Sequence, residues 1–310
     1  MHGSTGRAAD DIAALAEDAG ASGLSYARPS PELDGLVTGY QVFTDHGAGP
    51  DGRVHHLLPG VANVRLAVDA GPVEILFGRG RRATMPPAAV IGLTTYAPRV
   101  TTHGGVLVGF GVTPLGWGRL FGRSAAELCD RVAPLDELVG PDLPAALLRG
   151  LGALPVLDAP SVASVLDRLL APAFARPGPD EPAVRALVAA LDAAEAATVA
   201  DLASATGLDA AALRRLTARY VGATPKLLLN RARFLRAFLG FFRAGDDGGY
   251  PGIDAHYYDT SHFLRDADRF LGMTPRRFAA LSTESLDRSL RARAAVLGGS
   301  TCVLPPAESA

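Results

Sequence analysis

The apolar residues of this chain change their spacing close to Thr113, and that change limits the fold more than any other feature. From Gly35 to Thr113 they fall in short runs rich in Val, Leu and Ile, separated by Gly, Pro or Asp. The runs are VTGYQVF, RVHHLL, NVRLAV, VEILF, AVIGLTT, PRVTTH and VLVGFGV. Such runs, spaced by about 8–12 residues, are typical of strands in a small sandwich or barrel. Beyond Thr113 the apolar residues recur at helical spacing.

The two patterns predict an α+β fold, with a small N-terminal β-barrel or sandwich, following helices and an all-α C-terminal domain. HGG, His103–Gly105, is expected to turn a hairpin between the last two runs, and Ser124 is expected to cap a helix together with Glu127. Three prolines and a glycine mark residues 175–182 as either a break between helices or the domain linker, and the linker is the interpretation adopted. The predicted division is 1–25 (tail, or a short helix at Ala8–Ala19), 26–174 (β-rich sensory or dimerisation domain with C-terminal helices), 175–182 (linker), 183–285 (helical domain) and 286–310 (tail).

Composition sets the broad class of protein. Apolar residues make up 48% of the chain and charged residues 20%, which is enough apolar material for a core. No apolar run approaches the roughly 18 residues of a membrane helix, and the acidic N-terminal stretch does not resemble a secretory signal. The two cysteines, Cys129 and Cys302, lack metal-ligand spacing and suit a reducing compartment. We therefore predict a cytoplasmic protein with no membrane partner.

The segment TVADLASATGLDAAALRRLTARY, which starts at Thr198, predicts a helix–turn–helix. Gly207 can adopt the left-handed conformation that ends the first helix, and Asp209 is a suitable N-cap for the second. In the second helix the leucines point inward, whereas three arginines remain outside: Arg214, Arg215 and Arg219. An ordinary helical hairpin with solvated arginines is the alternative interpretation of this segment.

Local charge favours the DNA-binding interpretation. Residues 196–244 contain eight basic and two acidic side chains, a net charge of +6 in a chain whose formal net charge is −2. A concentrated basic patch of this kind is what attraction to phosphates requires.

The segment LASATGLDAAALRRLTARYVGATPKLLLNRARFLRA resembles the first half of an AraC/XylS-type DNA-binding domain, and DTSHFLRDADRFLGMTPRRF resembles the second half. In both halves a G-x-T-P sequence follows the expected recognition helix. The resemblance implies two helix–turn–helix units joined by a long helix, about Pro225–Arg243, so that residues 183–285 form the DNA-binding domain. The N-terminal half is similar to that of a sub-group of these regulators whose ligand is unassigned.

The resemblance also implies residue roles. In the first unit, Ala211 and Arg214 fall on variable base-facing positions and Arg215 on the family's recurrent arginine; both arginines could donate to guanine or grip phosphate. Contacts to phosphate are expected from Arg219, Lys226 and Arg231, with a solvated surface as the alternative. In the second unit, Thr260 and Ser261 fall on base-facing positions and Arg265 on the recurrent arginine. For His262, a half-packed imidazole is as good an interpretation as DNA contact.

Both units depart from the family pattern. The family usually has phenylalanine where this chain has Thr217 in the first unit and Ala267 in the second, which predicts looser packing, and the glycine of the second turn is replaced by His256. Residues 247–255 read DGGYPGIDA, and their glycines and proline disfavour the supporting helix. Residues 245–280 carry four basic and six acidic side chains. We therefore predict that DNA contact is concentrated in the first unit and that the second is degenerate.

Signals for catalysis are weak. His55 and His56 are adjacent, so a regular strand would point them to opposite faces, and no glycine-rich phosphate loop or nucleophile elbow is present in the sequence. No catalytic residue, metal site or cofactor is predicted, and an enzyme is retained only as a remote alternative. Trp117, the only tryptophan, is expected to cover the core.

The sequence is therefore interpreted as a transcriptional regulator that binds double-stranded DNA, with a small-molecule effector of unknown identity and a homodimer as further partners implied by the resemblance. Ligand would act by shifting the arrangement of the two domains. The alternative is an interaction or ligand-binding protein whose DNA-binding domain has decayed.

Overall fold

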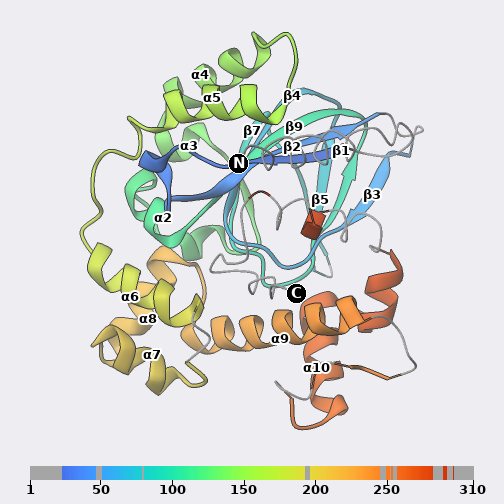
Figure 1. The fold of residues 1–310 in the computed structure, drawn as a ribbon, viewed down its shortest axis with the longest axis vertical. Helices are drawn as coiled ribbons and strands as arrows, with labels where there is room; N and C mark the ends of the chain where they lie inside the picture. Colours follow the sequence, from blue (N-terminus) through green and yellow to red (C-terminus); the bar gives the residue numbers. More distant parts are fainter. Residues whose placement is uncertain are drawn as a thin grey trace, which may run out of the picture.

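A computed structural model describes residues 23–46, 51–78, 80–192, 196–244, 249–251, 253, 257–281, 289–291 and 296. The expected N-terminal tail or helix, His256 and most of the expected C-terminal tail lie outside these residues. The described part has the predicted α+β architecture, with two β-sheets in the N-terminal part and helices in the C-terminal part (Figure 1).

Both sheets are antiparallel. The six-stranded sheet has the order β1 (Gly23–Ala27), β2 (Val37–Asp45), β9 (Gly105–Val112), β4 (Asn63–Ala70), β7 (Ala88–Ile91) and β10 (Val132–Pro134). The four-stranded sheet has the order β3 (Arg53–His56), β8 (Arg99–Thr102), β5 (Val73–Phe77) and β6 (Arg81–Thr84). Apolar side chains from the two sheets, including Ile75, Phe77 and Leu107, meet in one cluster, so the sheets form a sandwich.

The hairpin predicted at His103–Gly105 is wrong. β8 pairs with β3 and β5, whereas β9 pairs with β2 and β4, so the turn carries the chain from one sheet to the other. Gly104 and Gly105 both have positive φ, 88° and 98°, which glycine tolerates and which allows this sharp change of direction. A strand pattern alone does not reveal which sheet each strand joins.

Helices cover the outer face of the six-stranded sheet and then continue away from it (Figure 1). The short elements are η1 (Pro31–Leu33), α2 (Pro114–Leu120), η2 (Ala125–Leu128) and α3 (Asp136–Val139). The longer helices are α4 (Asp142–Gly152), α5 (Ala159–Leu170), α6 (Glu181–Asp192), α7 (Val199–Thr206), α8 (Ala210–Tyr220), α9 (Pro225–Ala244) and α10 (Thr260–Leu271). None of the helices in the described ranges is long and apolar enough to span a membrane.

The prediction that Ser124 caps a helix is also wrong. Ser124 precedes the 3-10 helix η2 without capping it, and its hydroxyl donates instead to the Ala218 carbonyl of α8, at 3.2 Å. Glu127 pairs with Arg123 on the surface. Trp117 is buried in the core as expected, and its indole N–H donates to the Arg123 carbonyl.

The predicted linker, residues 175–182, follows α5 and includes the first two residues of α6, and one hydrophobic core continues across it. This core runs from the six-stranded sheet through α5 to α6, α7, α8 and the start of α9. A second core, rich in phenylalanine, joins the rest of α9 to α10. The first helix–turn–helix is therefore packed onto the β-rich part.

Polar contacts reinforce that junction. Arg119 of α2 donates to both carboxylate oxygens of Glu181, at 2.6 and 3.1 Å, and the Gly178 N–H donates to the same carboxylate at 3.0 Å. Next to it, the Tyr220 hydroxyl donates to Asp180 at 2.6 Å. These contacts fix the segment before α6 between α2 and α8.

We predict that Glu181→Gln makes the chain less stable at neutral pH and less sensitive to acid. The Arg119 guanidinium, aided by the Gly178 N–H, holds the pKa of Glu181 down from 4.5 to about 2. A carboxyl whose pKa is depressed by folding stabilises the protein above its unfolded pKa and loses that contribution as the pH falls toward the folded value. Urea unfolding of the wild type should therefore lose stability between pH 4.5 and pH 2 more steeply than Glu181→Gln does. Glu127→Gln, in an exposed pair, is the control and should follow the wild type.

Candidate nucleic-acid interface and ligand cavity

Helices α7 and α8 form a sharply defined helix–turn–helix. Thr198 and Asp201 make a reciprocal capping box at the start of α7, and Gly207 ends the helix in the left-handed conformation, with φ 66°. Asp209 then caps α8 by accepting from the Ala212 N–H at 2.7 Å. Leu202 and Leu213 are fully buried between the helices. The caps and turn expected from the sequence are thus all present.

The outer face of α8 is basic and exposed. Ala211, Arg214, Arg215 and Arg219 are all exposed, and the Arg219 guanidinium lies over the Tyr220 ring, 5.4 Å from its centre. Lys226, in the first turn of α9, is exposed as well. The structure therefore brings these predicted contacts to the solvent side of one helix–turn–helix.

The opposite face of α8 packs on the β-rich part. Thr217 is fully buried, and its hydroxyl donates back to the Arg214 carbonyl. At the end of α8, Gly222 has φ 95°, and a β-carbon there would lie 2.9 Å from the Ala125 carbonyl of η2. Glycine at this position lets η2 approach closely, so the region beneath α8 is occupied by the N-terminal part of the chain.

Arg231, unlike Arg219 and Lys226, is not exposed to solvent. Its side chain is buried, at 4% exposure, and it donates to the Pro59 carbonyl at 2.6 Å. In this arrangement it links α9 to the loop after β3 instead of facing solvent. This burial was not predicted, because the sequence of a long helix does not show which of its basic side chains another part of the chain will cover.

Helix α10 forms in the second unit, and the residues described just before it include no helix. Thr260, Ser261 and Arg265 are exposed on α10, whose N-cap Asp259 accepts from the His262 N–H at 2.7 Å. The residues described between α9 and α10, 249–251, 253 and 257–259, contain no helix. Ile253 and Tyr257 are buried against the phenylalanine-rich core.

Asp266 faces inward and is part of a buried polar network. The Tyr257 hydroxyl donates to it at 2.7 Å and Arg233 at 3.2 Å, while the Arg233 guanidinium also lies 4.9 Å from the centre of the Tyr257 ring. Burial and the hydrogen bond to Asp266 raise the pKa of Tyr257. His262 is partly exposed, and its ring lies edge-on to Tyr257. Asp268, in contrast, is exposed on α10.

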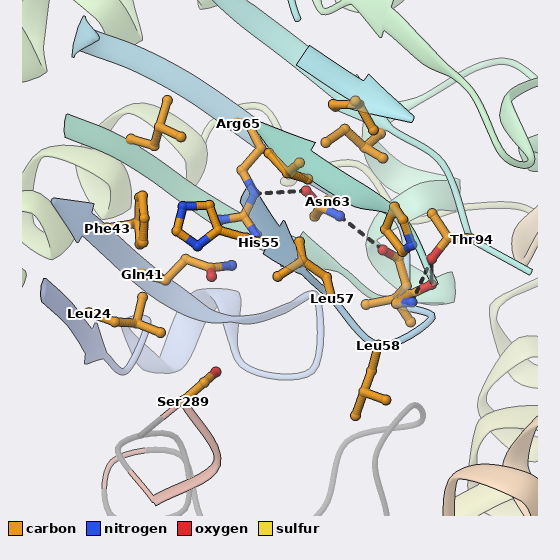
Figure 2. Close-up of a pocket in the computed structure, with 18 of the residues that line it drawn as sticks. Leu24, Gln41, Phe43, His55, Leu57, Leu58, Asn63, Arg65, Thr94 and Ser289 are labelled. Carbon is orange, nitrogen blue, oxygen red and sulfur yellow. Dashed lines mark hydrogen bonds between the residues drawn. The ribbon is translucent and has the colours of Figure 1, made fainter. Parts of the chain in front are cut away.

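A cavity of about 310 Å³ lies between the two sheets. Figure 2 shows the polar side chains of its wall, among them Gln41 of β2, Arg65 of β4 and His55 of β3. The Arg65 Nε–H donates to the Asn63 side-chain oxygen at 3.0 Å, and His55 shares a hydrogen bond with Thr102. Burial lowers the pKa of the His55 imidazole, which favours its neutral form. The sequence carried no signal for this cavity, because it arises from strands distant along the chain.

The rim of the cavity contacts the second unit. Pro59 lines the cavity and accepts from Arg231, and the Ala97 N–H donates to the Phe270 carbonyl of α10 at 2.7 Å. His56, which also lines the cavity, lies edge-on to Phe278. Within the described ranges, no three His, Cys, Asp or Glu side chains are placed to hold a metal ion.

The sequence matches no protein-family model and no curated protein. Solved structures do resemble the fold. ToxT from Vibrio cholerae is 7% identical, with a TM-score of 0.44 over 84% of this chain and 98% of that one. A ToxT structure with a bound unsaturated fatty acid is 9% identical, with a TM-score of 0.43 over 84% and 95% of the two chains. The AraC-like activator CuxR is 16% identical, with a TM-score of 0.24 over 79% and 93%.

Proposed function

We propose that the chain is a DNA-binding transcriptional regulator of the AraC/XylS type whose DNA contact is concentrated in α7 and α8. The observation that carries the proposal is the exposed basic face of α8 on a fully capped helix–turn–helix. A helix of this kind can enter the major groove, where an arginine can donate bidentately to guanine. Arg214 and Arg215 are the residues proposed to read bases, with Ala211 packing beside them.

The remaining basic side chains position the protein. Arg219 and Lys226 flank the recognition helix and are proposed to bind phosphates, which orient without reading sequence. Arg231 has no such role in this proposal, because its guanidinium donates a hydrogen bond to the Pro59 carbonyl. In the second unit, Thr260, Ser261 and Arg265 are proposed to make weaker contacts, since the charge around them is acidic.

The cavity between the sheets is proposed to hold a small-molecule effector. Its rim contacts α9 and α10, so a ligand that moves the rim would shift the arrangement of the second unit. Such a shift requires that the ligand bind one arrangement better than the other. No catalysed reaction is part of this function.

A second candidate function is an interaction or ligand-binding protein that no longer binds DNA. It is favoured by the missing helix among the described residues before α10 and by the acidic charge of residues 245–280. Selection of sequences from a random DNA pool separates the two candidates. The regulator is expected to select a short site, as long as one recognition helix can read, and binding should weaken steeply with salt. A pool that yields no enriched sequence even at low salt would favour the second candidate.

A further inference from the structure

The polar wall of the cavity is assembled across three neighbouring strands. Gly109 of β9 pairs with Gln41 of β2 on one side and with Arg65 of β4 on the other. A β-carbon at Gly109 would lie 2.6 Å from Arg65 Nη1, so glycine here leaves the space in which the Arg65 guanidinium lies. The opposite wall is apolar and includes Val73, Ile75 and Val100.

Arg65 is a cation without an anionic partner in this wall. No aspartate or glutamate occurs among the described residues that line the cavity, and Arg65 is their only lysine or arginine. The guanidinium donates a hydrogen bond from Nε to the Asn63 side-chain oxygen, which leaves its two Nη groups available to bind an anion. Burial lowers the pKa of Arg65, because a guanidinium removed from water is destabilised unless an anion compensates it.

We propose that this cavity binds an apolar monocarboxylate, with the carboxylate on the Arg65 guanidinium and the hydrocarbon part against Val73, Ile75 and Val100. The planar fork of arginine matches a carboxylate and forms charge-assisted hydrogen bonds with it. Gln41 is placed to donate a further hydrogen bond to the same head group. The volume lies at the lower end of the range of small-molecule sites, about 300–1,000 Å³, which suits a single chain or ring system and excludes a phospholipid.

This inference extends the effector part of the proposed function but is tested without DNA, so the two can fail separately. Decanoate and decanol, which share a chain and differ in charge, are titrated into the full-length protein by calorimetry. Decanoate is expected to bind more tightly than decanol. Arg65→Met is expected to weaken decanoate binding by about ten- to a hundredfold, the range for losing a charge-assisted hydrogen bond, and to leave decanol binding unchanged.

One further variant tests the geometry. Arg65→Lys keeps the charge but not the planar fork and should bind decanoate with intermediate affinity. If Arg65→Met fails to fold, the proposal is tested by the ratio of decanoate affinity to decanol affinity, which should be smaller in Arg65→Lys than in the wild type. Equal binding of decanoate and decanol, binding of neither, or full decanoate affinity in folded Arg65→Met would overturn the proposal.

Discussion

Replacing Arg214 and Arg215 together by alanine is expected to abolish selective binding to the DNA site while leaving the fold intact. Both side chains are exposed on α8, so their removal leaves no buried group unsatisfied. A bidentate arginine–guanine pair contributes about 1–3 kcal/mol of discrimination. Two such contacts correspond to a loss of roughly thirtyfold or more. A mobility-shift titration with the selected site and a scrambled site measures this loss directly.

The matched control removes the same charge from another surface. Arg149 of α4 and Arg168 of α5 are exposed on the helices that cover the six-stranded sheet, away from the proposed DNA face. Arg149→Ala combined with Arg168→Ala lowers the net charge equally and should leave specific binding nearly unchanged. Equal losses in the two double variants would mean that α8 attracts DNA only through overall charge and does not read bases.

The second large effect is expected in the second helical unit. Asp266→Ala removes the acceptor shared by Tyr257 and Arg233 and leaves both polar groups without it in a largely buried network. Leaving a buried hydrogen-bonding group such as the Tyr257 hydroxyl without its partner costs about 1–3 kcal/mol, and Arg233 adds less because its side chain is 34% exposed. Asp266→Asn, which keeps an oxygen for the Tyr257 hydroxyl, should cost less. Urea unfolding followed by near-ultraviolet circular dichroism of the tyrosines would measure both.

Asp268→Ala is the control for this effect, because it removes the same charge from an exposed position of the same helix. Because Asp268 lies at an exposed position, its replacement is expected to cost less than that of Asp266, whose carboxylate is buried. If Asp268→Ala destabilised the protein as much as Asp266→Ala, helix charge rather than the buried network would be responsible. If DNA contact is concentrated in the first unit, Asp266→Ala should also weaken DNA binding less than the loss of Arg214 and Arg215.

The helical half could be predicted in detail because its signals are local. A glycine that ends one helix and an aspartate that caps the next act within a few residues, so the sequence determined the turn before α8 correctly. The same holds for the long helix α9, which extends over Pro225–Ala244. Where glycines and a proline disfavoured a helix before α10, the described residues form none.

The β-rich half was predicted less well because its arrangement depends on contacts between distant segments. The exposed strand β6, which begins with two arginines, has no apolar run to mark it, and the turn after β8 joins two sheets instead of two paired strands. The burial of Arg231 likewise depends on its contact with Pro59, which lies 172 residues away in the sequence. The cavity lined by Arg65 could not be predicted either, because its walls come from strands that are distant along the chain.

The hydrogen bond from the Ala97 N–H to the Phe270 carbonyl has a thermodynamic consequence. Ala97 follows a stretch of chain that lines the cavity at Thr94, and Phe270 lies in the last turns of α10. If occupancy of the cavity changes the free energy of this contact, then the order of α10 must change the affinity for the occupant by the same factor, because coupling between two sites is reciprocal. Amide hydrogen exchange at Ala97 would then report on events at both sites. Under the proposed function, the order of α10 would then set the effector concentration at which the protein responds, whether or not α10 contacts DNA.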